Sequence, residues 1–335
     1  MRYRRLGCSG LMVSEIALGA GNFGKRVDQK TSTDTVDYAL DHGINFIDTA
    51  DWYGDGLSES FLGNALKGKR QNVILATKFG SGVGTGPNDR GCSRYHILDA
   101  LDKSLKRLRT DHIDIYQMHI PDPQTPLEET LRTLDDIVHA GKVRYLGLSN
   151  HAAWQVGEAL WQARMLNSEP LVSVQARYNL LDRRIEEELI PCCQRHGVGL
   201  LPWSALAGGF LTGKYRRGEA PPEGSRMTNP PAINVRALHD ANFDKLTRLE
   251  AFCSVHGYSV GQLAIMWLLA KPWVSSVLSG PMRAEQLDLY FSAAETQLGA
   301  DEVAELDSIS SWQAEDMDPL YLPFLRQQQP DGVTR

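Results

Sequence analysis

The chain has 335 residues and a mass of 37.2 kDa, with 42% hydrophobic and 23% charged residues. These proportions are those of an ordinary globular protein, and a net charge of −6 excludes the strongly basic composition expected for a nucleic-acid partner. No apolar run approaches the roughly 18 residues of a membrane-spanning helix, so no membrane association is expected. The five cysteines are scattered and fit no metal-ligand spacing, which favours a reducing, cytoplasmic location.

Short apolar runs alternate with amphipathic stretches along the chain, which is the pattern of parallel strands joined by crossover helices. A β-hairpin is expected over residues 2–13. Eight strands are then predicted at residues 15–19, 44–48, 73–77, 113–119, 143–148, 171–176, 198–203 and 274–279. This pattern predicts an α/β fold, a (β/α)₈ TIM barrel over about residues 14–295 within a single domain of residues 1–335. A C-terminal helix and tail are expected over residues 296–335.

Capping residues and apolar stripes mark the predicted helices. They are expected behind a Thr31/Ser32 cap, behind Ser93, over residues 127–138 before Gly141, and at 152–165, 185–196, 239–256, 260–270 and 283–293. The Gly- and Pro-rich segment 204–235, after the seventh strand, is too long for an ordinary loop, which predicts a lid over the barrel mouth. A shorter excursion is predicted after the third strand, at residues 80–87.

A glycine-rich motif near the start of the chain is similar to a nucleotide-binding loop. Residues Gly19 to Gly24 match G-x-G-x-x-G after a strand, a pattern typical of a Rossmann pyrophosphate loop. That mechanism needs the last glycine to open a helix, so that the helix N-terminus faces the phosphate. Since the helix cap is expected only at Thr31, the Rossmann interpretation is disfavoured.

Four ionisable residues lie at or just beyond the ends of predicted strands: Asp48, Tyr53, Lys78 and His119. A TIM barrel collects such residues at its reactive face. A lysine ammonium beside Tyr53 would lower the phenol pKa, and a paired Asp48 would keep that lysine protonated. Tyr53 is therefore predicted to be a general acid, with His119 orienting a carbonyl oxygen.

The residues around these four resemble the motifs of the aldo-keto reductase superfamily, over about residues 2–295. The motifs are Asp48-Thr-Ala-Asp51-Trp-Tyr53-Gly, Ala76-Thr-Lys78, Tyr116-Gln-Met-His119, Gly147-Leu-Ser149-Asn150, Gln175-Ala-Arg-Tyr178-Asn179 and Trp203-Ser204-Ala-Leu206-Ala-Gly208-Gly-Phe-Leu-Thr-Gly-Lys214-Tyr215. The chain is most similar in character to bacterial aldo/keto reductases related to potassium-channel β-subunit-like reductases and sugar dehydrogenases.

The resemblance implies an NADP-dependent oxidoreductase without a metal, acting on an aldehyde, ketone or sugar. Its catalytic residues would be Asp48, Tyr53, Lys78 and His119. Its cofactor-binding residues would be Ser149, Asn150, Gln175, Trp203, Ser204, Leu206, Gly208, Lys214, Arg283 and Gln286. Phe23, Trp52 and His119 would line the substrate side. NADPH is the preferred cofactor and NADH stays possible, because Leu289 and Tyr290 replace the usual adenine contacts and Arg283 is equally explained as a surface arginine.

Two alternatives to carbonyl reduction remain open from the sequence. One is an NAD(P)⁺-dependent sugar dehydrogenase that works in the oxidative direction. The other is a cofactor-binding regulatory or sensor subunit with little turnover. Substrate identity, stereochemistry and oligomeric state are not determined by the sequence.

Overall fold

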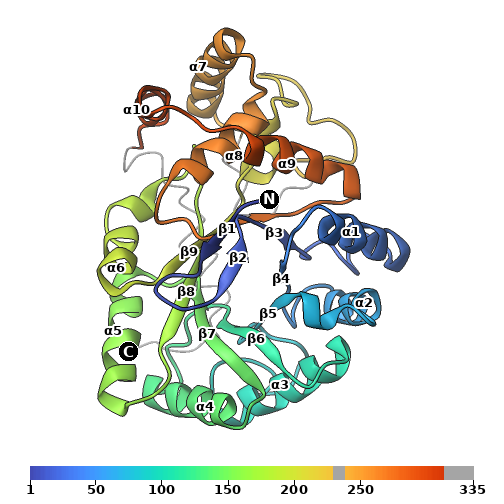
Figure 1. Ribbon diagram of the computed structural model, residues 1–335, viewed down its shortest axis with the longest axis vertical. Helices are drawn as coiled ribbons and strands as arrows, with labels where there is room; N and C mark the ends of the chain where they lie inside the picture. Colours follow the sequence, from blue (N-terminus) through green and yellow to red (C-terminus); the bar gives the residue numbers. More distant parts are fainter. Residues whose placement is uncertain (229–237, 313–335) are drawn as a thin grey trace.

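The computed structural model describes residues 1–228 and 238–312. Eight parallel strands in the described residues form a nearly closed barrel, in the order β10-β3-β4-β5-β6-β7-β8-β9 (Figure 1). The strands are β3 (Ile16–Gly19), β4 (Phe46–Asp48), β5 (Ile74–Phe79), β6 (Ile113–Met118), β7 (Val143–Ser149), β8 (Leu171–Arg177), β9 (Gly199–Trp203) and β10 (Val277–Ser279). An isolated parallel bridge between Leu200 and Val274 joins the two ends of the sheet. The predicted TIM barrel is confirmed.

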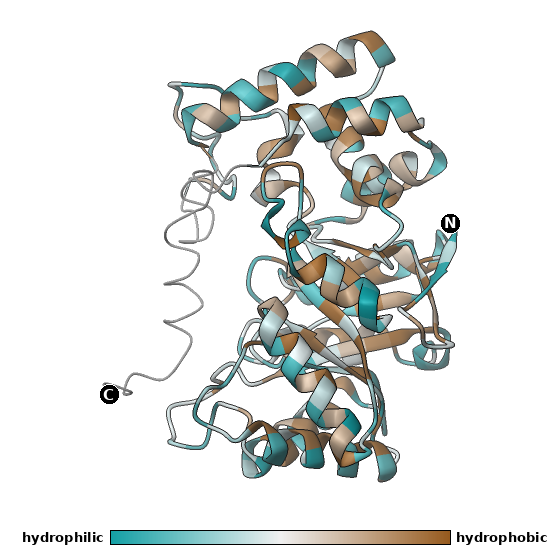
Figure 2. Ribbon diagram, turned by 90° about the vertical axis from the view of Figure 1, so that its left-hand side faces the viewer, coloured by the Kyte–Doolittle hydropathy of each residue, from teal (hydrophilic) through white to brown (hydrophobic). Residues whose placement is uncertain are grey.

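The interior of the barrel is packed with side chains from the strands and from the N-terminal hairpin. Strands β1 (Tyr3–Arg5) and β2 (Met12–Ser14) pair antiparallel, as predicted, and contribute Leu6 and Val13 to this core. The strand residues of the same cluster are Ala17, Phe46, Ala76, Ile115, Val172, Leu201 and Leu278. A larger apolar cluster fills the space between strands and helices. Figure 2 shows the hydrophobic colour concentrated on the strands and the inner helix surfaces.

The helices surround the barrel on its outer side (Figure 1). They are α1 (Gln29–Asp41), α2 (Leu57–Ala65), α3 (Arg94–Leu108), α4 (Leu127–His139), α5 (Ala153–Leu166), α6 (Leu189–His196), α7 (Asp240–His256), α8 (Val260–Ala270), α9 (Asp288–Glu295) and α10 (Ala300–Ile309). Short 3₁₀ turns are η1 (Arg70–Asn72), η2 (Arg184–Glu186), η3 (Ala207–Thr212) and η5 (Ala284–Leu287). The predicted helices are present, including one C-terminal helix, and α2 is an additional helix. The predicted tail at 313–335 and residues 229–235 of the predicted lid lie outside the described residues.

The start of α1 differs from the prediction. The N-cap is Asp28, whose Oδ1 accepts a hydrogen bond from the Thr31 N–H at 2.8 Å, so the predicted Thr31/Ser32 cap is wrong by three or four residues. Aspartate is as good a cap as serine or threonine, and several such residues follow one another here. Residues 19–24 do not form a Rossmann loop, because Gly24 has φ of 72° and its N–H bonds to the Val27 carbonyl in a turn rather than opening the helix.

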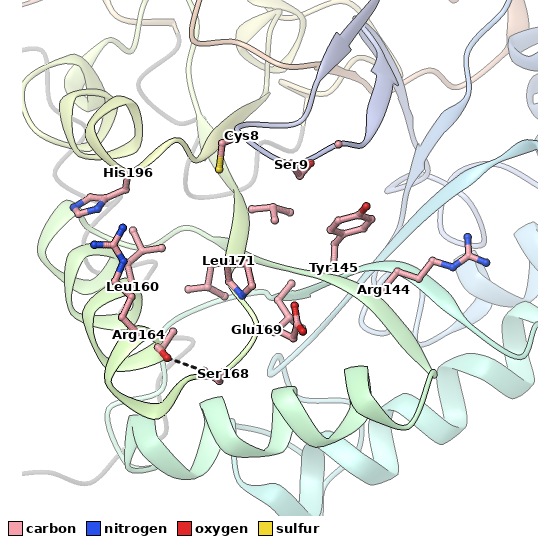
Figure 3. A pocket seen from close by; sticks show the side chains of 15 residues that line it. Cys8, Ser9, Arg144, Tyr145, Leu160, Arg164, Ser168, Glu169, Leu171 and His196 are labelled. Carbon is pink, nitrogen blue, oxygen red and sulfur yellow. Dashed lines mark hydrogen bonds between the residues drawn. The ribbon is translucent and has the colours of Figure 1, made fainter.

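A pocket of about 360 Å³ opens at the end of the barrel where the strands begin (Figure 3). Its lining includes Tyr145 and Leu171 from the first residues of β7 and β8, together with Cys8 from the hairpin. Arg144 also lies there, but its guanidinium is already paired with Asp114 at 2.8 Å. In a TIM barrel this face contributes to stability, since the active site lies at the other end of the strands.

The helices of the described part of the chain do not individually match a membrane-spanning segment. No single helix within it is both long and apolar enough to cross a membrane, and only α7 and α8 taken together, across an 89° bend, have the required length and composition.

Candidate active site

The four predicted catalytic side chains converge where the strands end. Asp48 is the last residue of β4, Lys78 the last but one of β5, and His119 directly follows β6. Tyr53 lies in the turn between β4 and α2. Alternation along a strand explains why Lys78 points into the barrel, while its neighbour Thr77 bonds outward to Glu59 of α2.

Lys78 is the centre of the hydrogen-bond network. Its Nζ donates to Asp48 Oδ1 at 2.6 Å, to the Thr49 carbonyl at 2.7 Å and to Tyr53 Oη at 3.3 Å. Both Lys78 and Asp48 are buried, so this is a desolvated ion pair rather than a surface contact. The third donor of the ammonium is thereby directed at the phenol.

The pKa of Tyr53 is the point at which the structure corrects the sequence analysis. Lys78 does pull this pKa down, as expected, but burial of the phenol outweighs it and Asp48 opposes it, so the net pKa lies above the usual value of 10. For Lys78, burial lowers the pKa and Asp48 raises it, with a net rise. At neutral pH the site therefore holds a neutral phenol beside a charged ammonium, which suits proton donation.

His119 completes the group at the mouth of the barrel. Its ring lies 5.7 Å from the Tyr53 ring, edge to face, and 6.4 Å from the ring of Trp52, which is 41% exposed. Burial and the charge of Lys78 lower the pKa of His119 well below its ordinary value, so the imidazole is neutral at pH 7. Ser81 Oγ lies 3.2 Å from Nδ1, and a hydroxyl that donates there places the imidazole proton on Nε2.

Asp48 has two further partners inside the barrel. Gln117 of β6 and Gln175 of β8 both donate from their amide nitrogens to Asp48 Oδ2, at 3.0 and 2.9 Å. Gln175 was predicted as a nicotinamide contact, and the structure shows its amide nitrogen bonded to Asp48. Gln117 was missed, although its position two residues before His119 on an inward-facing strand is a signal that alternation alone supplies.

A second set of predicted residues is connected through Asn150. Its amide nitrogen donates to the His119 carbonyl and to Ser149 Oγ, both at 3.1 Å, and its oxygen accepts from Trp203 Nε1 at 3.1 Å. Asn150 and Ser204 have φ of 61° and 63°, a left-handed conformation that asparagine adopts more readily than serine. Such strained positions gather where a ligand site fixes the backbone.

The segment after β9 supplies the predicted phosphate contacts. Ser204, Leu206 and Gly208 are partly exposed there, and Gly208 has φ of 67°. Lys214 is exposed, with its Nζ 5.3 Å above the Tyr215 ring. The structure also brings in Arg226, which the sequence analysis missed. Its charge reaches Tyr53 and acts to lower the phenol pKa.

Two predicted cofactor contacts and one predicted substrate contact have surroundings that favour these roles less. Arg283 and Gln286 are exposed around η5, and Gln286 uses its side-chain oxygen to accept from the Met282 N–H at 2.8 Å. Arg283 lies 3.7 Å from Glu285 and has a largely exposed side chain. Phe23 has no exposed surface and packs in the apolar core, which argues against its predicted contact with substrate.

The described residues contain no group of three or more His, Cys, Asp or Glu side chains that could hold a metal ion. They do fit a dinucleotide. Trp203 presents an aromatic surface beside the Asn150 amide, while Lys214 and Arg226 provide positive charge near small residues. The site thus has the features of a barrel oxidoreductase that uses a nicotinamide cofactor.

Comparison with known proteins agrees with this class. The model of the aldo/keto reductase family matches residues 15–311, and the chain belongs to that family. It is 39% identical over 320 residues to an uncharacterized oxidoreductase, YrpG, of Bacillus subtilis (strain 168), an alignment that covers 92% of this chain and 96% of that protein.

Two other relatives differ in what their names describe. Aldo-keto reductase YhdN of Bacillus subtilis (strain 168) is 34% identical over 325 residues, covering 92% of this chain and 93% of that protein. A probable voltage-gated potassium channel subunit beta of Arabidopsis thaliana is 38% identical over 293 residues, covering 86% and 89%. The chain is therefore an oxidoreductase of a family that also includes channel-associated relatives.

Proposed function

We propose that the protein reduces the carbonyl group of an aldehyde, ketone or sugar with NADPH, and that Tyr53 is the general acid. The observation that carries this proposal is the chain of contacts from Asp48 through Lys78 to Tyr53, with Lys78 Nζ 2.6 Å from the carboxylate and 3.3 Å from the phenol.

The proposed role of each residue follows from its protonation state. A reduced nicotinamide supplies the hydride that adds to the carbonyl carbon. Tyr53 donates its proton to the carbonyl oxygen, and Lys78 stabilises the phenolate that is left behind. Neutral His119 orients that oxygen by a hydrogen bond from its ring. Asp48 fixes Lys78 and keeps it charged.

The protonation state of Tyr53 agrees with the proposed role in carbonyl reduction. Burial raises it above 10, so the residue is a phenol at neutral pH and is ready to give a proton. The oxidative alternative, a sugar dehydrogenase, needs the phenolate as a base. A neutral phenol is the protonation state from which carbonyl reduction starts near pH 7.

The proposed cofactor position uses Trp203 as the surface on which the nicotinamide stacks, with Ser149, Asn150 and Gln175 near its carboxamide. Ser204, Leu206, Gly208 and Lys214 are proposed to hold the diphosphate, with Arg226 as an added cation. NADP rather than NAD is proposed from the resemblance, with the exposed Arg283, which lies 3.7 Å from Glu285, as the candidate partner of a 2′-phosphate.

The experiment is a set of steady-state rates for a panel of aldehydes, ketones and aldoses, with NADPH and NADH, in both directions. The proposal predicts carbonyl reduction with NADPH as the fastest reaction at pH 7. Faster oxidation of an aldose would replace it with the dehydrogenase alternative.

A second candidate function is favoured by the similarity to potassium channel β subunits. The chain would then bind NADPH tightly but oxidise it slowly. Measurable NADPH binding without turnover of any carbonyl in the panel would support this candidate over the reductase.

A further inference from the structure

Helix α5 carries an apolar stripe on its solvent side as well as on its buried side. Trp154, Trp161 and Met165 are 67%, 61% and 66% exposed. Successive helix residues are about 100° apart, so these three fall within about 40° of one another on one line along the helix. Val156, Ala159 and Ala163 lie on the opposite side and are buried. Single exposed apolar residues are ordinary, but an aligned set with two tryptophans marks a contact surface.

The neighbouring helix shows that this is not a general feature of the outer ring. In α4 the solvent side carries Glu128, Arg132 and Asp136, and Arg132 Nε donates to Glu128 at 2.9 Å. Both helices lie on the rim of the barrel in Figure 1. The exposed side of α5 therefore departs from the charged surface that its position in the fold would otherwise have.

A second observation on α5 is Gly157. Glycine inside a helix costs about 1 kcal/mol relative to alanine, so it calls for a packing reason. Two other described helices contain an internal glycine, and each has such a reason. A Cβ on Gly63 would lie 2.4 Å from the Arg107 carbonyl, and one on Gly261 would lie 3.0 Å from Leu289. A Cβ on Gly157 would meet nothing within 4 Å.

Gly157 fits the exposed stripe instead. Residues 154, 157, 158 and 161 are the i, i+3, i+4 and i+7 positions that together form one hole on a helix surface. Here the hole has a tryptophan at each end and glycine in the middle, so it is a hollow between Trp154 and Trp161 into which another helix can approach closely. Nothing within the described chain fills it.

We propose that this surface of α5 is the interface of a homodimer, in which two copies of α5 pair antiparallel about a two-fold axis between Gly157 and Glu158. The stripe is self-complementary about that point, because the midpoint of Trp154 and Trp161 falls between residues 157 and 158. A two-fold interface requires that if residue i contacts residue j, then j contacts i. Trp154 of one copy then contacts Trp161 of the other. Met165 lies one helical turn after Trp161 on the same copy, where its sulfur can make a favourable contact with the aromatic rings.

The tryptophans alone offer less surface than a specific dimer buries. An aromatic side chain offers about 150–250 Å². Four tryptophans exposed by 61% to 67% would therefore remove roughly 400–650 Å² from water, before the methionines and flanking residues are included. Specific interfaces bury about 1,200 Å² or more, and weaker transient ones less, so a weak, concentration-dependent dimer is expected.

The charge of Glu158 near the proposed two-fold axis should oppose dimer formation, so its removal should change the dimer affinity in a known direction. Two Glu158 carboxylates would approach each other across the axis, although Gln162 Nε2 lies 3.4 Å from Glu158 Oε1 and draws it aside. Removing this negative charge by Glu158→Gln should tighten the dimer. Neither Trp154 nor Trp161 is among the residues proposed for the active site, so carbonyl reduction and dimer formation are tested separately.

The experiment is sedimentation velocity of the full chain from about 1 to about 200 µM, a range that brackets micromolar dissociation constants. The wild type is expected to shift from monomer to dimer, and Trp154→Ala with Trp161→Ala to weaken the dimer about tenfold or more. Gly157→Leu should also weaken it, by filling the hollow, although the monomer has room for the side chain. The matched control is Tyr95→Ala, which removes a 69% exposed aromatic from α3.

Three results would overturn the proposal. They are a monomer throughout the concentration range, a dimer that survives the double tryptophan substitution, and a dimer that Glu158→Gln weakens. Thermal unfolding of each variant, compared with the wild type, establishes that a lost dimer is not a lost fold.

Discussion

The chemistry of the site depends on how Lys78 is held. Its ammonium is fully buried, and three fixed oxygens solvate it: the Asp48 carboxylate, the Thr49 carbonyl and the Tyr53 phenol. Because Asp48 in turn accepts from Gln117 and Gln175, four strands of the barrel contribute to one polar layer. The position of the phenol is thus set by the barrel rather than by a loop alone.

Lys78→Met should lower kcat for carbonyl reduction by about a hundredfold or more, because the phenolate formed by proton donation loses its neighbouring cation. The same change should cost about 3–5 kcal/mol of unfolding free energy, since it leaves Asp48 buried without its partner. Steady-state kinetics and chemical denaturation measure the two effects.

The double variant Asp48→Asn with Lys78→Met separates the effect on kcat from the effect on stability. It removes both charges, so stability should recover in large part while kcat stays low. Recovery of kcat together with stability would show that Lys78 acts only through folding.

The pH dependence of reduction is a second prediction at this scale. Tyr53 and Lys78 both have raised pKa values, and His119 has a lowered one, so none of the three changes charge between about pH 7 and 9. A profile of kcat against pH should be flat there and fall only on the alkaline side, as the phenol loses its proton. A break near pH 6.5 would instead assign the proton donor to a charged His119.

At the scale of elements, the end of β7 carries a buried histidine that couples the site to acid stability. His151 bonds through Nδ1 to the Ser149 carbonyl and lies 3.1 Å from Met118 Sδ of β6. Burial lowers its pKa from 6.5 to about 4. Between these two values the unfolded chain binds a proton that the folded chain does not, so the unfolding free energy decreases as pH falls through this window.

The expected contribution of His151 is a loss of about 2 kcal/mol on going from pH 7 to pH 5. His151→Gln should show a smaller loss over the same range, with some loss remaining because the pKa of His119 is lowered too. Denaturant unfolding at the two pH values measures this, with the exposed His239→Gln as control. An equal loss in His151→Gln and in the wild type would contradict the prediction.

The last described helix is anchored by one carboxylate. Asp307 of α10 accepts from Lys271 Nζ at 2.7 and 2.8 Å and from Trp267 Nε1 at 2.8 Å, both on or next to α8. Asp307→Ala should lower the unfolding free energy by about 2–3 kcal/mol, because Lys271 is buried, although Asp307 is partly solvated. Asp301→Ala, on the exposed side of α10, should change the unfolding free energy by less than about 0.5 kcal/mol. Denaturant unfolding of the two variants and the wild type measures both effects.

The elements show where prediction from sequence works and where it does not. Apolar runs and spacing locate every barrel strand, because burial on both faces leaves a continuous apolar signal. Helix α2 was missed, since its N-cap is Gly56, which has φ of 86° and provides no capping side chain. The strand predicted at 274–279 is shorter, Val277–Ser279, because Val274 pairs with β9 by a single bridge.

At the scale of the whole molecule, the barrel brings together groups that the sequence separates by more than a hundred residues. The four predicted catalytic residues could be named because each follows its own strand. Alternation along its strand could have pointed to Gln117, but its bond to Asp48 depends on strand register. Arg226 could not be named, because its role depends on the path of the loop after β9. The direction of the Tyr53 pKa shift could not be predicted from the sequence either, since it depends on how deeply the phenol is buried.

The central claim is that Tyr53 donates the proton in carbonyl reduction, and a single-turnover comparison tests it directly. NADPH is bound first to the wild type and to Tyr53→Phe, with binding followed by fluorescence, and oxidation of the bound NADPH is then followed after mixing with an aldehyde that the wild type reduces. The account predicts equal NADPH affinity and a rate at least about a hundredfold lower in Tyr53→Phe. Equal rates in the two proteins would contradict it.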